Sequence, residues 1–484
     1  MTRPVLPNKC HHVVARPGCS CCSAEVRAIN RRLGQDLTRR GFIAGSSASV
    51  ALLGLSAYSG AKAQTAAVPP VLFTNARLFD GLELNTREGV SVLVQGGMIA
   101  EVAQGAVAPP DGATVIDAAG RTLMPGLIDA HWHTMLCGLP VAQLMTADAG
   151  DIHLAAAAQA ERTLMRGFTT IRDLGGPSFP LKRAIDAGAV KGPRIYPSGA
   201  MISQTSGHGD FRLIWELPGS QGNLSRSDAL MATALADGRD AVLRATREQL
   251  MQGASQIKIV AGGGASSFYD PIDVTQFLPE EVEAAVLAAE DWGTYVAAHV
   301  YTPRGIQRCL TAGVKCIEHG QLADEDSVKM MADRNVVWSI QPFVQALANP
   351  NLPESVIAKQ RLLWEGTDQA YELAIKHKIP TGWGSDILFD AAATATQGRN
   401  LAYMTRWYTP AQALKLATAD NAFILGMSGL RNPYPGALGI IANGAHADML
   451  LVEGDPTADL SLVADPEKNF RVIMKAGQIY KNTL

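Results

Sequence analysis

Short apolar, β-branched runs alternate with longer helical stretches through the middle of the chain, and this alternation limits the possible folds more than any other feature. The eight runs are Leu127–His133, Phe168–Leu174, Arg194–Ile202, Gln256–Ala261, Tyr295–Val300, Cys316–Gly320, Val336–Gln341 and Pro380–Asp386. Eight strand–helix units are the number that closes a (β/α)8 barrel, also called a TIM barrel. A doubly wound open sheet would alternate in the same way, but no Gly-rich phosphate-binding turn follows the first run. We therefore predict an α/β fold with a TIM barrel over residues 125–430.

Strand-like runs also flank this region on both sides. Several lie within residues 71–124, where the Gly96-Gly97 pair is typical of a hairpin turn. Beyond the predicted barrel, the corresponding runs are Ala447–Val452 and Phe470–Tyr480. One small β domain assembled from both ends would explain the shared pattern. The sequence thus predicts a β-sandwich made of residues 64–124 and 431–484.

The first 63 residues carry a targeting pattern. Thr38–Ile43 contains an arginine pair and precedes an apolar run ending at Tyr58, after which Ala61-Lys62-Ala63 supplies small residues for a cleavage site. The segment resembles a twin-arginine leader, so we expect a signal peptide at residues 1–63 and a periplasmic location. The run is rich in Gly, Ser and Ala and is too weakly apolar to predict a membrane span, so we expect no stable span after the leader is removed. An uncleaved membrane anchor is the alternative.

Charge and cysteine content narrow the partners to be expected. The net charge is −3 and no basic cluster with interleaved aromatic residues is present, so we expect no nucleic-acid partner. Three cysteines follow the leader, and an odd count argues against a disulfide framework. A Cys/His cluster between Cys10 and Cys22 has no recognised zinc-finger spacing, which leaves metal binding there as an open alternative.

Metal-compatible side chains occur at the ends of the predicted strands, where TIM barrels place their working residues. His131 and His133 are two positions apart at the end of the first run, so both side chains point to the same face. Lys258 lies between apolar residues in the fourth run. Burial would favour its neutral amine, which can react with carbon dioxide to form a carbamate that acts as a carboxylate ligand.

Three further candidates end later runs: His299 the fifth, His319 the sixth and Asp386 the eighth. A single histidine at a strand end is more often structural than functional. Six metal-compatible residues at the ends of five strands are difficult to attribute to chance, because the strand ends of a barrel meet at one rim. These residues therefore predict a shared metal site.

The motifs around these residues resemble those of the amidohydrolase superfamily, and in particular its binuclear carboxypeptidase-like branch, which includes prolidase-type peptidases and ochratoxin-cleaving amidases. The motifs are Pro125–His133, Lys258, His299, Ile317–Gly320 and Gly384–Asp386. The resemblance implies two divalent metal ions, one bound by His131 and His133 and the other by His299 and His319, with carbamylated Lys258 bridging them and Asp386 completing the set.

The resemblance also implies metal-assisted hydrolysis, in which a hydroxide shared by the two ions attacks an amide carbonyl. Asp386 would take the proton from that hydroxide and pass it to the departing amine. His208, in the polar loop after the third run, would orient the bound carbonyl. Mixed imidazole and oxygen ligands favour zinc, although manganese and iron are compatible with the same ligand types.

The expected substrate is a small molecule or short peptide with an amide bond next to a free carboxylate, such as a dipeptide, an N-acyl amino acid or an ochratoxin-like amide. Tyr301, with Arg212 or Arg304, is a candidate grip for that carboxylate, although loop arginines are usually solvated. The alternatives are a mononuclear or cyclic-amide hydrolase or deaminase resembling imidazolonepropionase, and a catalytically silent binding protein. Association into a homo-oligomer is a further expectation, because relatives of this kind commonly associate.

Overall fold

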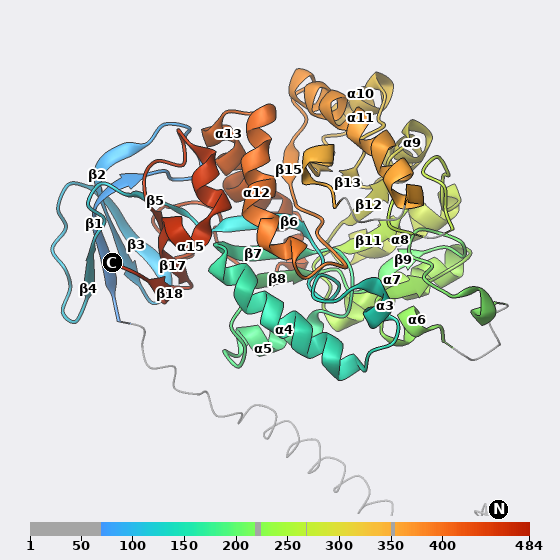
Figure 1. Ribbon diagram of the computed structural model, residues 1–484, viewed down its shortest axis with the longest axis horizontal. Coiled ribbons are helices and arrows are strands. Elements are labelled where there is room, and N and C mark those ends of the chain that lie inside the picture. The colour runs from blue at the N-terminus through green and yellow to red at the C-terminus, as the bar shows by residue number, and fades with distance from the viewer. Residues whose placement is uncertain (1–68, 218–223, 268, 350–353) are drawn as a thin grey trace, which may run out of the picture. The chain divides into compact units, whose positions relative to one another are not determined.

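The computed structural model describes residues 69–217, 224–267, 269–349 and 354–484. The predicted leader at residues 1–63 and the early Cys/His cluster lie outside these ranges. Figure 1 shows the described elements with their labels. Among them, no helix is both long enough and apolar enough to cross a bilayer.

Ten strands in the middle of the chain form two parallel sheets. The first has the order β6-β7-β8, and the second has the order β10-β9-β11-β12-β13-β14-β15. The bounds are β6 (Leu127–Trp132), β7 (Phe168–Asp173), β8 (Arg194–Pro197), β9 (Met201–Ser203), β10 (Thr233–Leu235), β11 (Ile257–Val260), β12 (Val296–Val300), β13 (Cys316–His319), β14 (Val337–Ile340) and β15 (Thr381–Trp383). Every pairing in both sheets is parallel, as strands joined by helical crossovers must be.

Each of the eight predicted runs contains a strand, but the third contains two. Pro197 ends β8, and Gly199 with φ of +75° turns the chain before β9 begins at Met201. The short strand β10 had no counterpart among the predicted runs. The pairing of the described strands shows two separate sheets and not one closed ring of eight, so the fold is α/β with parallel sheets.

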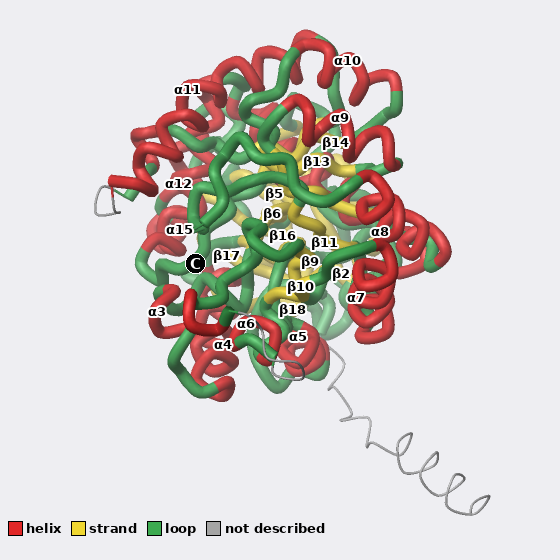
Figure 2. Tube along the Cα trace, turned by 90° about the vertical axis from the view of Figure 1, so that its right-hand side faces the viewer, coloured by secondary structure: helices red, strands yellow, loops and turns green. Residues whose placement is uncertain are grey.

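Helices connect these strands and lie around them in Figure 2. The longer ones are α4 (Ala149–Met165), α5 (Phe179–Asp186), α7 (Arg239–Gln252), α8 (Pro279–Asp291), α9 (Pro303–Ala312), α10 (Glu325–Asp333) and α11 (Glu354–Lys376). The shorter ones are α3 (Val141–Leu144), α6 (Arg226–Ala229), α12 (Gln397–Ala402), α13 (Pro410–Lys415), α14 (Asn421–Gly426) and α15 (Pro466–Asn469). Local chemistry fixes several ends: Asp148 and Asp324 cap α4 and α10, and Gly253 and Gly313 end α7 and α9 in the left-handed conformation.

Hydrogen bonds connect the two parallel sheets at both junctions. The Asp386 amide, just after β15, donates to the carbonyl of His131 in β6 at 2.9 Å. The Ser255 amide, just before β11, donates to the carbonyl of Pro197 at the end of β8 at 2.7 Å. The end of β15 is thereby held against the end of β6, which brings His131 and Asp386 together.

Both flanks of the chain contribute to one mixed sheet of eight strands. Its order is β18-β17-β16-β5-β1-β2-β3, with β4 beside β1. The strands are β1 (Val71–Leu78), β2 (Arg87–Gln95), β3 (Met98–Gln104), β4 (Thr114–Asp117), β5 (Thr122–Pro125), β16 (Met449–Val452), β17 (Phe470–Lys475) and β18 (Gln478–Asn482). The described strands of this region form a single sheet, and a two-sheet sandwich is not evident from their pairing. Arg194 in β8 makes a bidentate ion pair with Asp448, just before β16, at 2.9 and 3.1 Å.

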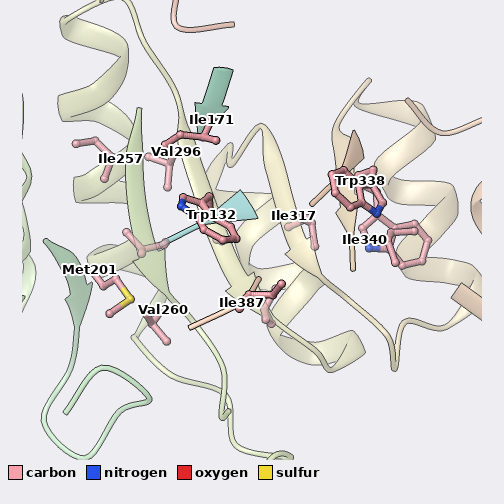
Figure 3. Close-up of a cluster of buried hydrophobic side chains, with 14 of the residues drawn as sticks. Trp132, Ile171, Met201, Ile257, Val260, Val296, Ile317, Trp338, Ile340 and Ile387 are labelled. Carbon is pink, nitrogen blue, oxygen red and sulfur yellow. The ribbon is translucent and has the colours of Figure 1, made fainter. Parts of the chain in front are cut away.

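A continuous apolar core fills the space between the parallel strands and the helices. Trp132 lies within it, as do Ile171 of β7 and Ile317 of β13 (Figure 3). The Trp132 ring is 5.9 Å from the guanidinium of Arg166, which follows α4. This position agrees with the alternation along β6, which directs Trp132 to the opposite face from His131 and His133.

Candidate metal centre

His131, His133 and Asp386 form a compact group at the junction of β6 and β15. One Asp386 oxygen, Oδ1, lies 3.3 Å from Nε2 of His131 and 3.1 Å from Nε2 of His133. The candidate ligand atoms of the three residues all lie within 4.8 Å of one another. Both imidazoles are buried and the Asp386 side chain is 13% exposed. Two nitrogens and a carboxylate at this spacing can share one metal ion.

The other two predicted histidine ligands lie beside this group. The His319 ring centroid is 4.7 Å from that of His131 and 4.5 Å from that of His299. Nδ1 of His319 is 4.0 Å from the second oxygen of Asp386. The His208 ring stacks on His299 with centroids 4.3 Å apart. The structure therefore brings side chains from five loops and strand ends into one cluster.

Lys258 lies in β11 and is 2% exposed. Two residues further along this strand, Val260 is in register with His299 of β12. Burial lowers the pKa of the Lys258 ammonium, although the nearby carboxylates of Glu318 and Asp386 oppose this effect. Burial is the largest cause that lowers the pKa of His131 and His319, and the charge of Lys258 lowers both pKa values further. Lys258 is thus electrostatically coupled to the cluster.

The imidazoles of His131, His299 and His319 are held in the neutral form that binds metals. Burial is the largest cause that lowers the pKa of His131, His299 and His319 well below the ordinary histidine value. Three imidazole nitrogens have no hydrogen-bond partner in the described part of the chain, namely Nε2 of His131, Nδ1 of His133 and Nδ1 of His319. Such orphaned buried nitrogens are costly unless another ligand satisfies them. The donor set and the orphaned atoms together fit a divalent metal ion.

Two of the candidate ligands have a strained backbone. His319 has φ of +72° and Asp386 has φ of +51°, in the left-handed region that residues other than glycine seldom adopt. Strain of this kind persists where the surroundings enforce it, commonly at functional sites. Gly384 is required nearby, because a Cβ there would lie 2.4 Å from Cβ of His131.

Glu318 and Arg172 support the centre, and we did not predict a role for Glu318. One oxygen of the fully buried Glu318 lies 2.8 Å from Nδ1 of His131, and the other accepts from Arg172 at 2.6 Å. Arg172 also donates to the carbonyl of Ala130 at 2.6 Å. The bond at Nδ1 directs Nε2 of His131 toward Asp386, as partners of metal-binding histidines commonly do. A residue of opposite charge in each of two fully buried strands, Arg172 in β7 and Glu318 in β13, was the signal that could have identified this pair.

Asp129 fastens the β6–β15 junction from the other side. Its carboxylate accepts from the amide of His131 at 3.0 Å, the hydroxyl of Ser385 at 2.6 Å and the side-chain amide of Gln397 at 2.8 Å. Burial raises the pKa of Asp129 to about 6, against the effect of these hydrogen bonds. Asp129 therefore holds the backbone on which His131 and Asp386 are mounted.

The predicted substrate contacts separate into two groups. Tyr301 is buried, with its ring 5.0 Å from His299 and 5.2 Å from His319, and it lies with His208 beside the cluster. The Arg212 guanidinium is instead paired with Asp210 in its own loop, at 2.6 and 2.8 Å. Arg304 is exposed in the first turn of α9. Among the described residues, neither arginine has a hydrogen bond or ion pair to the cluster, so their contact with substrate stays a prediction.

A sequence profile of the amidohydrolase family matches residues 122–481, which includes every residue of this cluster. The chain belongs to the amidohydrolase family. An ochratoxinase from Aspergillus niger is 32% identical over 327 residues, which cover 66% of this chain and 66% of that protein, just under two thirds of its length.

Solved structures of similar proteins agree with this assignment. A prolidase complexed with N-methylphosphonate-L-proline matches with a TM-score of 0.78 and 32% identity, covering 86% of this chain and all of that one. A Xaa-Pro dipeptidase with bound methionine matches with a TM-score of 0.74 and 27% identity, over 85% of this chain and all of that one. The family and these relatives indicate a hydrolase that acts on carbon–nitrogen bonds.

Proposed function

We propose that this amidohydrolase is a binuclear metal-dependent amidase, which cleaves an amide or peptide bond adjacent to a free carboxylate. The observation that carries the proposal is the group of His131, His133 and Asp386, joined by two further buried imidazoles and Lys258. Similarity to the ochratoxinase, the prolidase and the Xaa-Pro dipeptidase supports an ochratoxin-like amide, a dipeptide or an N-acyl amino acid as substrate.

The proposed metal ligands are His131, His133, Lys258 as a carbamate, His299, His319 and Asp386. Divalent cations at these residues, with zinc as our expectation, would polarise the scissile carbonyl and lower the pKa of water. The lowered pKa of Lys258 supports the carbamate, because only the neutral amine reacts with carbon dioxide. In that reaction the amine nitrogen bonds to the carbon of carbon dioxide and loses a proton. The resulting carbamate carries a negative charge, which would offset the charge of the cations.

Asp386 is suited to move the proton during hydrolysis. Burial alone would raise the pKa of this carboxyl, but the proximity of His131 and His133 holds it below its ordinary value, so it is ionised and able to accept a proton. We propose that it takes a proton from the attacking water and delivers it to the amine that leaves. Because Oδ1 and Oδ2 face different histidines, the carboxylate can serve both steps without a large rotation.

His208 is proposed to orient the carbonyl. Burial lowers the pKa of this imidazole to about 4, so it is neutral near pH 7, and Ser267 lies 2.8 Å from its Nδ1. That contact and the stacking on His299 fix the ring and leave Nε2 for the substrate. Tyr301, whose pKa burial raises, stays a neutral phenol that can donate a hydrogen bond to a carboxylate.

We further propose that the two parallel sheets are parts of one (β/α)8 barrel. The hydrogen bonds from Asp386 to His131 and from Ser255 to Pro197 support this proposal at the two junctions. A barrel would place the whole cluster at its carboxyl-terminal rim. The domain boundaries, the exported leader and the periplasmic location stay predictions from the sequence.

A hydrolysis screen tests the proposed activity. Purified protein supplied with zinc would be offered dipeptides and N-acyl amino acids, each with a free or an amidated terminal carboxylate. We expect turnover of the free acids and at least tenfold lower kcat/KM for the amidated forms. Turnover of cyclic amides alone would favour the imidazolonepropionase-like alternative and contradict our proposal.

A further inference from the structure

An apolar cavity of about 40 Å³ lies next to the candidate metal centre. Six of the residues that line it are Met135, Leu136, Leu144, Met201, Phe211 and Phe389, and we call it the methionine pocket. Two lining residues are polar, but Ser227 contacts Ser225 at 3.1 Å and Nδ1 of His153 contacts the carbonyl of Ala149 at 2.8 Å. The walls are otherwise hydrocarbon, sulfur and aromatic ring.

The pocket is built from the same loops that carry the centre. Met135 follows His133 by two residues, Phe211 follows His208 by three and Phe389 follows Asp386 by three. The Phe389 amide donates to the carbonyl of Leu136 at 2.8 Å, and the rings of Phe211 and Phe389 meet edge to face at 5.9 Å. The loops that carry His133, His208 and Asp386 therefore also form the walls of the pocket.

Gly175 marks the wall that the pocket shares with the centre. A Cβ at this position would lie 2.7 Å from Cγ of Met201 and 3.1 Å from Nδ1 of His133. Gly175 thus lies between Met201, which lines the pocket, and the candidate ligand His133.

We propose that the methionine pocket receives an apolar side chain of the substrate, next to the amide that is cleaved, and so selects substrates with an aliphatic or aromatic substituent. This inference rests on the proposed amidase function. A pocket without free polar groups penalises a charged substituent, because burying an unpaired charge is costly. A cavity of 40 Å³ has space for roughly three water-sized groups, which suits a small aliphatic side chain.

Larger substituents would require the lining to move. Met135, Met145 and Met201 all line the pocket, and methionine adapts its shape more readily than branched residues do. We therefore expect kcat/KM to rise with the size of an aliphatic substituent, and we expect the enzyme to accept a substrate with an aromatic ring at this position. Each buried methylene contributes about 0.8 kcal/mol, or about fourfold in kcat/KM.

The test uses full-length, zinc-supplied enzyme and a matched substrate series. Gly, Ala, Val, Leu, Phe, Asp and Lys would be placed in turn on each side of the scissile amide. At one of the two positions we expect kcat/KM to rise about fourfold per methylene from Gly to Leu, with Asp and Lys the poorest substrates.

Two variants locate the preference. Ala232 lines the pocket, and its carbonyl accepts from the Met201 amide at 3.2 Å, so A232L should fill the cavity and lower the Leu-to-Ala ratio of kcat/KM at least tenfold. Ala142 is exposed on α3 and does not line the pocket, so the matched A142L should keep the ratio within twofold. Circular dichroism and a thermal melt would establish that both variants are folded.

The outcomes separate the two proposals. Hydrolysis without an apolar preference at either position, or a folded A232L with an unchanged ratio, would overturn the pocket and leave the amidase function standing. Failure to hydrolyse any member of the series would overturn both.

Discussion

Replacing Glu318 by Gln removes a charge while keeping the shape of a side chain that is fully buried between Arg172 and His131. The carboxylate accepts from Arg172 at 2.6 Å with one oxygen and lies 2.8 Å from Nδ1 of His131 with the other. An amide has one acceptor oxygen, so it can satisfy one of these donors while its NH2 group faces the other. Burial would raise the pKa of Glu318, but Arg172 and Lys258 keep it below its ordinary value, so the charge is present in the wild type.

Two separate losses follow from this geometry. The guanidinium of Arg172 would be buried without its counter-charge, which should cost about 3–5 kcal/mol of unfolding free energy. His131 would lose the partner that directs its Nε2, which should weaken zinc binding about 10- to 100-fold. Urea unfolding of the metal-free protein measures the first loss, and titration against a zinc-competing dye measures the second.

A double variant distinguishes the two losses. R172M combined with E318Q removes both charges, so it should recover at least half of the stability that E318Q loses. Its zinc affinity should remain low, because His131 still lacks a carboxylate at Nδ1. If E318Q matched the wild type in both urea unfolding and zinc affinity, the supporting role of Glu318 would be refuted.

The remaining predictions concern the bridging lysine, the flanking sheet and the leader. K258A should bind at least one metal ion fewer per chain and lose hydrolysis by at least 100-fold, as elemental analysis and a dipeptide assay would measure; full activity would exclude the bridge. D448A should lose about 3–5 kcal/mol in urea unfolding, because Arg194 would be left largely buried without its partner, and a loss below 1 kcal/mol would contradict this. Replacing Arg39 and Arg40 by lysine in the full chain should retain the protein in the cytoplasm on cell fractionation, whereas unchanged export would remove the twin-arginine prediction.

Much of the candidate site could be predicted because it depends on simple periodicity. The two-residue period of a strand placed His131 and His133 on one face, and strand ends located His299, His319 and Asp386. The structure brings all five into one cluster. Such positions follow from strand direction alone and require no knowledge of the loops.

Features that depend on tertiary contacts could not be predicted in this way. The division of the third run is a different case, because the turn-forming residues Pro197, Ser198 and Gly199 could have marked it in the sequence. The pairing of Glu318 with Arg172 joins strands far apart in the sequence. The pairing of Arg212 with Asp210, only two residues away, is likewise a side-chain contact that the strand pattern does not indicate. Side-chain partners decide these cases, and the sequence pattern does not encode them.

Anomalous diffraction at the zinc edge from crystals of the active, zinc-supplied enzyme is the most direct test of the metal centre. We predict two zinc peaks, one contacted by His131 and His133 and the other by His299 and His319, with density from Lys258 continuing between them. An enzyme that hydrolyses its amide substrate while showing no anomalous peak at these side chains would contradict the proposed centre.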